Sequence, residues 1–324
     1  MAQGVPAASE PESTAVRMGP PERSVAEWLV RLEQASRIPS FIGTFVVTSA
    51  TGAMSSARIW HVCEGDVQIE RVEALSGVPR TIFRRNQSVV TFFPQARVAV
   101  SDRRDAGGAF PNLLTSSSSA SMADHYAAKE LGQSRVAGFD ADVVYLRPHD
   151  ELRYGYRIWS ERNTGLVIKT QTLDGKGRVL EQSAFSELQL NAPVQAVKLT
   201  RMMERTEGYK VEKPHRTPTS AAAEGWTLSG EVPGFSSQSC YRHGTDAGGG
   251  VVQWIFSDGL ATVSLFMEAF DARRHPSEGV VAMGATHTLT QRLPDASGPW
   301  WVTAVGEVPP ATLKALVSRL QRKP

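Results

Sequence analysis

Short strand-like segments follow one another along most of this chain, and no helical segment separates consecutive strands. In the first half they are SFIGTFVVTS, SSARIWHVCE, DVQIERVEAL, PRTIFRR and SVVTFFP, punctuated by Gly, Asn and Pro. Connections this short join antiparallel neighbours, whereas parallel strands need a crossover of a dozen or more residues. The pattern therefore predicts an antiparallel sheet and argues against a doubly wound fold.

Helical segments are expected at only a few places. In RSVAEWLVRLEQASR, Val25, Trp28 and Leu32 recur at helical spacing, and Ser24 with Glu27 forms a capping box. A Ser-rich interruption of the strand pattern is followed by SMADHYAAKEL, residues 121–131, which we expect to form a short helix. Near the C-terminus, PPATLKALVSRLQ has a leucine stripe and two prolines suited to a first helical turn.

A chain of 324 residues is too long for one ordinary core, so two domains are expected. Composition changes after residue 200, where ERTEGYKVEKPHRTPTSAAAEG is typical of an extended linker. The first residues are rich in Pro, Ala, Ser and Glu, which predicts disorder. The expected organisation is a disordered segment (1–23), a sheet domain (24–204), a linker (205–225) and a small α+β domain (226–324).

Charge and composition exclude several functional classes. A formal net charge of +2 gives no reason to expect a polyanion partner. There is no run of 18 apolar residues and no secretory signal at the start, so an exported form would have lost its signal from this chain. Cys63 and Cys240 lie far apart; we expect two free thiols, and a long-range disulfide stays open.

The stretch RYGYRIWSERNTGLVIKTQTLDGKGRVLEQ, residues 153–182, holds enough polar groups to raise the question of an active site. Its periodicity instead predicts three strands joined by the turns ERNTG and DGKG, with Tyr154 and Tyr156 on one face and Trp159 on the other. Asp174 is expected to bond to its own turn. An enzyme acting on an envelope glycolipid would have Asp174 and Glu181 as its acid and base.

The sequence provides no catalytic motif beyond that pair. It contains no HExxH, GxSxG, Walker A or strand-linked GxGxxG pattern, so we expect no enzyme, no cofactor and no metal. Arg80, Arg84 and Arg85 hint at a basic cluster, but an exposed strand face explains them equally, and we expect no nucleic-acid partner.

The first domain has more apolar side chains than its few helices can cover. An incompletely filled curved sheet could hold an acyl chain or an apolar peptide segment. The alternative is that these side chains simply form the core. The candidates for such a groove are Trp60, Phe83, Phe92, Phe93, Phe110, Leu113, Leu114 and Trp159.

Four segments resemble a known family, the periplasmic sigma-factor regulators RseB and MucB. They are RIWHVCEGDVQIERVEALSGVPRTIFRRNQSVVTFFP, YGYRIWSERNTGLVIKTQTLDGKGRVLEQSAFSEL, FSDGLATVSLFME and VGEVPPATLKALVSRL, in the family's order. The similarity runs from about residue 24 to the C-terminus, interrupted mainly at the linker. Thr81 stands where the family usually has an acidic residue, TSSSSAS replaces a more aromatic segment, and the two cysteines are outside the family pattern.

The resemblance implies a fold and a role. The first domain would be an unclosed half-barrel with a helical plug, similar to the lipoprotein carriers LolA and LppX, and the second a small α+β domain. Family members bind the periplasmic part of a membrane-spanning anti-sigma factor and shield it from the site-1 protease. A lipidic signal, such as lipopolysaccharide, is thought to release the partner. The implied compartment is the periplasm.

Two further points stay open at the level of sequence. A lipid or lipoprotein carrier of the LolA kind would also use a half-barrel, although simple carriers lack a second domain. A homo-oligomer is compatible with everything above.

Overall fold

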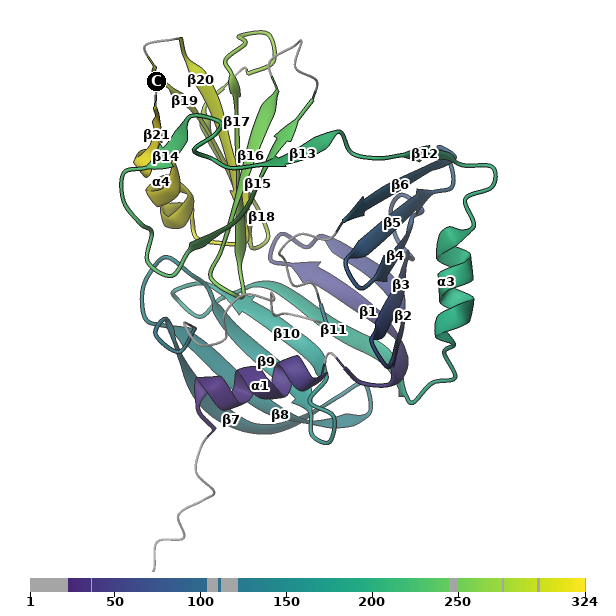
Figure 1. Cartoon of the computed structure of the whole chain (residues 1–324). Coiled ribbons are helices and arrows are strands. Elements are labelled where there is room, and N and C mark those ends of the chain that lie inside the picture. Colours follow the sequence, from purple (N-terminus) through teal and green to yellow (C-terminus); the bar gives the residue numbers. More distant parts are fainter. Residues whose placement is uncertain are drawn as a thin grey trace, which may run out of the picture.

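The computed structural model describes residues 23–35, 37–103, 110–111, 122–244, 250–275, 277–295 and 298–323. Within these ranges the chain forms two main sheets, a larger one below and a smaller one above in Figure 1. The larger sheet has twelve described strands in the order β12-β6-β5-β4-β3-β2-β1-β11-β10-β9-β8-β7. Its strands are β1 (Ser40–Ser49), β2 (Met54–Glu64), β3 (Val67–Ala74), β4 (Thr81–Arg85), β5 (Ser88–Phe93), β6 (Val98–Arg103), β7 (Tyr126–Val136), β8 (Phe139–Pro148), β9 (Gly155–Glu161), β10 (Val167–Leu173), β11 (Val179–Leu190) and β12 (Lys210–Glu212).

The larger sheet is open, because β12 and β7 are its edges and do not pair with each other in the described residues. Every pair in it is antiparallel except β12 with β6. Short connections join the strands from β1 to β6 and from β7 to β11, as the spacing of the Gly and Pro signals predicts. The predicted class, a half-barrel of antiparallel strands followed by a smaller α+β part, is confirmed.

The stretch 153–182 is built as predicted, with β9, β10 and β11 joined by two glycine turns. Gly165 and Gly177 have φ of +77° and +76°, a backbone region that glycine reaches without steric cost. In the second turn the Asp174 carboxylate accepts hydrogen bonds from the backbone N–H groups of Lys176 and Arg178, both at 2.9 Å. The turn interpretation of Asp174 is therefore confirmed.

Helix α1 (Val25–Ala35) lies across β7–β10 on the inner face of the large sheet (Figure 1). The predicted capping box is present, since the Ser24 N–H donates to the Glu27 carboxylate at 2.7 Å and the Glu27 N–H donates to Ser24 Oγ at 3.3 Å. Trp28 and Leu29 are fully buried against Val144 and Ile158. Burial of this apolar stripe holds the helix in place.

The outer face of β2–β6 is covered by a second helix, α3 (Ala196–Glu204), where the sequence pattern indicates no helix. It lies on the far side of the sheet from the second domain (Figure 1). Leu199 and Met203 pack there with Val62, Phe83 and Phe92. This helix is short, so its stability comes from that packing more than from its own propensity.

One predicted helix is wrong. Residues 121–131 were expected to be helical, but β7 begins at Tyr126 and pairs with β8 along its whole length. Ala127, Ala128, Lys129 and Glu130 favour a helix in isolation, yet ladder hydrogen bonds to β8 override that preference. The Ser-rich segment before it, the implied plug region and nearly all of 1–23 lie outside the described residues.

The second domain has a sheet in the order β13-β15-β16-β17-β20-β19-β18 and a packed helix. The helix, α4 (Pro310–Arg319), buries Leu313, Leu316 and Val317, as its stripe predicts. Trp226, Leu265 and Val302 complete the core. The strands are β13 (Arg216–Thr219), β15 (Ser236–His243), β16 (Val251–Ser257), β17 (Thr262–Ala269), β18 (Gly279–Met283), β19 (Thr286–Leu293) and β20 (Trp300–Gly306), with β14 (Trp226–Leu228) and β21 (Leu320–Arg322) forming a separate pair.

The predicted linker, 205–225, is extended, but it is not detached from the sheets. Its β12 adds a parallel edge to the large sheet, and its β13 adds an edge to the small one. Arg216 also donates from its guanidinium to Asp102 at 2.6 Å. Cys63 in β2 and Cys240 in β15 are free thiols, so the two sheets are not joined by a disulfide.

Replacing Trp28 with Ala should lower the free energy of unfolding by about 3–5 kcal/mol, because it leaves a cavity under α1. Chemical denaturation would measure the loss. Val30 on the same helix is 47% exposed, so Val30→Ala is the matched control and should stay within about 0.5 kcal/mol of the parent. Equal losses in the two variants would contradict the assigned packing face.

Candidate functional site

The two domains meet at a buried ion pair. Arg153, just before β9, donates from Nη1 to Oδ2 of Asp258 at 3.1 Å, and both side chains are fully buried. Arg153 also donates to the Pro233 carbonyl at 2.6 Å and to Asp150 at 3.0 Å. Since a buried charge is costly unless it is paired and hydrogen-bonded, these contacts make Arg153 the centre of the junction.

Asp258 accepts hydrogen bonds from both domains. The Tyr126 hydroxyl donates to Oδ2 at 3.2 Å, while the backbone N–H groups of Leu260 and Ala261 donate to Oδ1 at 3.0 and 2.8 Å. Burial raises the pKa of Tyr126 well above its usual value, so that hydroxyl keeps its proton. Asp258 therefore stabilises its own turn through one carboxylate oxygen and binds the first domain through the other.

Further contacts extend the junction on either side of this pair. Thr312 at the start of α4 donates from its hydroxyl to the Leu152 carbonyl, and the Tyr154 hydroxyl lies 3.2 Å from Nδ1 of His287. Gly284, in the turn between β18 and β19, approaches so closely that a Cβ there would lie 3.2 Å from the Glu181 carboxylate. The second domain is thus seated on β9–β11.

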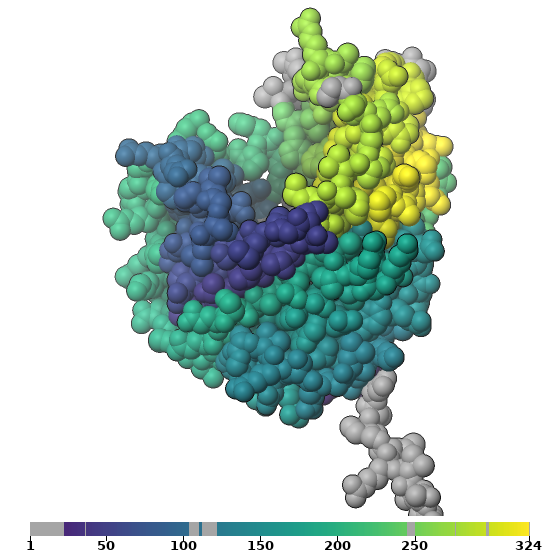
Figure 2. Space-filling model, turned by 180° about the vertical axis from the view of Figure 1, so that it is seen from behind, coloured from purple at the N-terminus to yellow at the C-terminus, as the bar shows by residue number. Residues whose placement is uncertain are grey.

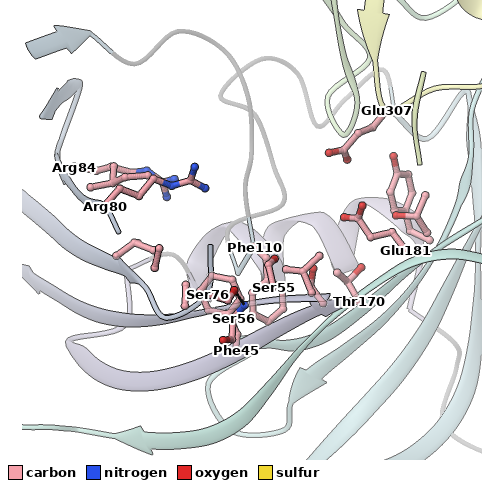
Figure 3. A pocket seen from close by; sticks show the side chains of 18 of the residues that line it. Phe45, Ser55, Ser56, Ser76, Arg80, Arg84, Phe110, Thr170, Glu181 and Glu307 are labelled. Carbon is pink, nitrogen blue, oxygen red and sulfur yellow. Dashed lines mark hydrogen bonds between the residues drawn. The ribbon is translucent and has the colours of Figure 1, made fainter. Parts of the chain in front are cut away.

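A cavity of about 360 Å³ lies between the inner face of the large sheet and the second domain. Seen from behind, the second domain sits on the teal strands, and a hollow separates it from the blue strands β4–β6 (Figure 2). Figure 3 shows the side chains converging on the cavity from both domains. The cavity is lined by Phe45, Val47, Ser55, Ser56, Ala57, Val72, Ala74, Ser76, Arg80, Ile82, Arg84, Phe110, Tyr156, Thr170, Thr172, Glu181, Ser183, Leu260 and Glu307.

Charge is distributed unevenly along this cavity. Arg80 and Arg84 lie at one end, and Glu181 and Glu307 lie at the other (Figure 3). Burial, together with the charge of Glu307, raises the pKa of Glu181 to about 7. The pKa of Glu307 is also raised by surrounding protein atoms, although its side chain keeps contact with solvent. The acidic end therefore holds two carboxylates that disfavour each other's ionisation.

Strand alternation decides which of the predicted groove residues reach the cavity. On β4, Ile82 and Arg84 line it, so Phe83 between them faces the opposite side and packs under α3. Phe92 lies beside Phe83, with ring centroids 5.8 Å apart. Phe83 and Phe92 are thus core residues of the outer layer, and Phe110 is the predicted residue that lines the cavity.

The remaining predicted groove residues lie elsewhere. Trp60 is sandwiched on the outer face by Arg58 and Arg71, at 5.5 and 4.4 Å from its ring. Trp159 is 8% exposed and lies opposite to Tyr156 in the alternation of β9, with Lys169 Nζ 4.6 Å from its ring. Phe93 ends β5 and is partly exposed. Leu113 and Leu114 fall outside the described residues. A role for any of these residues in ligand binding stays a prediction.

Sequence reasoning missed Arg153, Asp258 and Glu307 as junction and cavity residues. Asp258 and Glu307 both stand inside segments quoted for the family resemblance, FSDGLATVSLFME and VGEVPPATLKALVSRL. The predicted groove residues are aromatic or leucine side chains, whereas the cavity is lined mainly by small, hydroxyl and charged groups. Charged residues within otherwise apolar strand segments were the available signal.

The arrangement offers no catalytic constellation built on the acid and base considered above. Asp174 is engaged by its own turn and by Arg178, with 2.7 Å between carboxylate and guanidinium. Its hydrogen bonds within the turn lower its pKa despite the opposing effect of burial. Across the described part of the chain, no three His, Cys, Asp or Glu residues gather as a metal site, and no helix is long and apolar enough to cross a membrane.

The fold and the junction define a class of protein in which two sheet domains share one cavity. Comparison with known protein families identifies the family within this class. Models of the MucB/RseB N-terminal domain and C-terminal domain match residues 24–203 and 220–321. The chain therefore belongs to the MucB/RseB family, and the resemblance seen in the sequence is confirmed.

Individual relatives agree with this assignment. The chain is 30% identical over 298 residues to the sigma factor AlgU regulatory protein MucB of Pseudomonas aeruginosa, covering 89% of this chain and 87% of MucB. It is 24% identical over 304 residues to the sigma-E factor regulatory protein RseB of Haemophilus influenzae, covering 93% and 92%. These relatives are regulatory proteins, and the family is not a family of enzymes.

Solved structures extend the similarity to three dimensions. The crystal structure of MucB in complex with MucA(peri) matches with a TM-score of 0.70 and 28% identity, covering 93% of this chain and 99% of that one. The MucA/MucB complex of Pseudomonas aeruginosa matches with a TM-score of 0.73 and 27% identity, over the same shares.

Arg153→Met should destabilise the protein by about 3–5 kcal/mol, because it leaves the Asp258 carboxylate buried and unpaired. The double variant Arg153→Met/Asp258→Asn should lose less, since no unpaired charge remains. Denaturant unfolding provides the measurement. Arg205→Met is the control, because that side chain is 83% exposed. A double variant that is less stable than Arg153→Met would contradict this account of the junction.

The acidic pair predicts a pH dependence of stability. The pKa of Glu181 is about 7 in the folded protein and near 4.5 in the unfolded chain, so the folded state holds a proton that the unfolded state releases. Between these values stability should fall as pH rises. Denaturation curves at about pH 5.5 and about pH 8 should show a larger drop for the parent than for Glu181→Gln. Identical drops would contradict the raised pKa.

Proposed function

We propose that this protein is a periplasmic negative regulator of an envelope-stress sigma factor. It binds the periplasmic region of a membrane-spanning anti-sigma factor and keeps the site-1 protease from cutting it. The observation that carries the proposal is the match of both family domains, in order, over 24–203 and 220–321. The structural match to MucB in complex with MucA(peri) supports the choice of partner.

The junction supports a regulator more than a passive container. Arg153 and Asp258 hold the two domains at one angle, so a partner that contacts both would meet a preformed surface. Any ligand that favours another arrangement would weaken partner binding by linkage. Release by a lipidic signal is therefore part of the proposal, with the shared cavity as the place where such competition would act.

A lipid or lipoprotein carrier is the second candidate, because the large sheet is an open half-barrel. The second domain weighs against it, since Leu260 and Glu307 form part of the cavity wall and would obstruct transfer of a large cargo. Handover of a labelled lipoprotein to an acceptor would favour this candidate.

Addition of the purified protein should slow cleavage of the anti-sigma periplasmic region by its site-1 protease, in proportion to the fraction bound. The half-life of the intact fragment on a gel is the readout. Arg153→Met should protect less, because the two domains no longer form one preformed surface, while Arg205→Met should protect as well as the parent. An unchanged half-life at saturating concentration of the parent would refute the proposed function.

A further inference from the structure

Two acidic side chains from different domains converge at one end of the cavity. Glu181 extends from β11 of the large sheet, and Glu307 follows β20 of the small one (Figure 3). Among the described residues neither carboxylate has a hydrogen-bond donor or a cation that would lower its pKa. A cationic group placed between two such carboxylates would be stabilised by charge-assisted hydrogen bonds to both.

A separate polar group at the same end also lacks a partner. Thr170 is 8% exposed and lines the cavity, and its hydroxyl makes no hydrogen bond within the described part of the chain. In the strand register Thr172 lies opposite Glu181, and Thr170 lies opposite Ser183 beside it. A buried hydroxyl without a partner is costly, so a donor arriving from outside would satisfy it.

The opposite end of the cavity carries the complementary charge on Arg80 and Arg84, of which Arg84 also pairs with Glu70, with 3.4 Å between guanidinium and carboxylate. Arg84 lies on β4 and Glu181 on β11, with β3, β2 and β1 between them. The path from β4 to β11 therefore crosses four strand-to-strand spacings. At roughly 4.8 Å per step this is about 19 Å along the sheet. Between the ends, Phe45 and Phe110 present an apolar floor, with ring centroids 5.3 Å apart.

The spacing identifies the kind of occupant. An extended polypeptide rises about 3.3 Å per residue, so roughly six residues span this distance. The two charges of a single phospholipid headgroup are only a few bonds apart and cannot reach both ends. A peptide segment can place a cation at one end, an anion at the other and apolar side chains between them.

We propose that the cavity receives an extended segment of the partner protein, whose Lys or Arg side chain binds between Glu181 and Glu307 while a carboxylate about six residues away faces Arg80 and Arg84. This rests on the proposed function for the identity of the partner. It adds the chemistry of the recognised segment, a basic and an acidic residue flanking an apolar stretch.

The titration of the acidic end follows from this geometry. An arriving cation lowers the pKa of Glu181 from about 7 and removes its repulsion with Glu307, so binding releases protons and weakens as pH falls through that value. The other titratable groups near this end are Tyr154, Tyr156, Asp174 and His287, whereas Arg80 and Arg84 lie at the far end of the cavity. Burial raises the pKa of Tyr154 to about 12 and that of Tyr156 well above 10, so neither tyrosine contributes.

The test measures affinity for the anti-sigma periplasmic region by titration calorimetry at about pH 8, where both carboxylates are ionised to a larger extent. Glu181→Gln and Glu307→Gln should each raise Kd about tenfold, and the double variant about a hundredfold, because each removes one charge-assisted contact. Glu207→Gln is the matched control, since its side chain is 81% exposed and should leave Kd unchanged. His287→Gln should keep the pH dependence.

A second arm makes the result independent of the partner. The probe is a synthetic hexapeptide with Lys at one end and Glu at the other, compared with the same peptide carrying Gln at both. The parent should prefer the charged peptide about tenfold, and the double variant should show no preference. If the parent fails to bind the anti-sigma region but retains this preference, the proposed function falls and the cation site stands.

Two results would overturn the inference. One is a double variant that binds both probes as tightly as Glu207→Gln does. The other is a double variant that loses only dihexanoyl phosphatidylethanolamine, with both protein probes unaffected, because the acidic pair would then serve a lipid amine. In either case continued protection of the anti-sigma fragment would leave the proposed function intact.

Discussion

The buried contact between Arg153 and Asp258 determines how the rest of this molecule is arranged. Removing two charges from water is unfavourable, and their attraction compensates only when further hydrogen bonds satisfy each group. Here Pro233 and Tyr126 provide such bonds, one from each domain. Because the partners come from both sides, the pair is satisfied in one relative orientation of the domains. The orientation brings the second domain onto β9–β11 and leaves a cavity beside β1–β4.

That cavity has properties that neither domain has alone. The large sheet contributes a wall of small, hydroxyl and aromatic side chains with two arginines at one end, and the second domain adds Glu307 beside Glu181. The raised pKa of Glu181 is a consequence of the junction, since burial and the charge of Glu307 both depend on where the second domain sits. Recognition and domain arrangement are therefore coupled through the same few side chains.

Much of the fold was predictable because strand alternation and turn residues are local signals. The three strands of 153–182, the capping box of α1 and the leucine stripe of α4 follow directly from spacing. The helix expected over 121–131 failed because β8 offers β7 a full ladder of hydrogen bonds, which local propensity cannot anticipate. The prediction of the groove residues was wrong for a different reason. Phe83 and Phe92 are buried aromatic residues of the large sheet, but they lie on the face that α3 covers.

The sequence by itself determined the strand succession, the turns, the presence of a second domain and the family, because each depends on residue order and spacing. Only the tertiary structure decided which face of the sheet meets α1, which meets α3 and which meets the second domain. It also decided that Arg153 and Asp258, 105 residues apart, would share a buried bond, and that Glu181 and Glu307 would face the same cavity. Such pairings depend on how two curved sheets pack, and no local pattern encodes that packing.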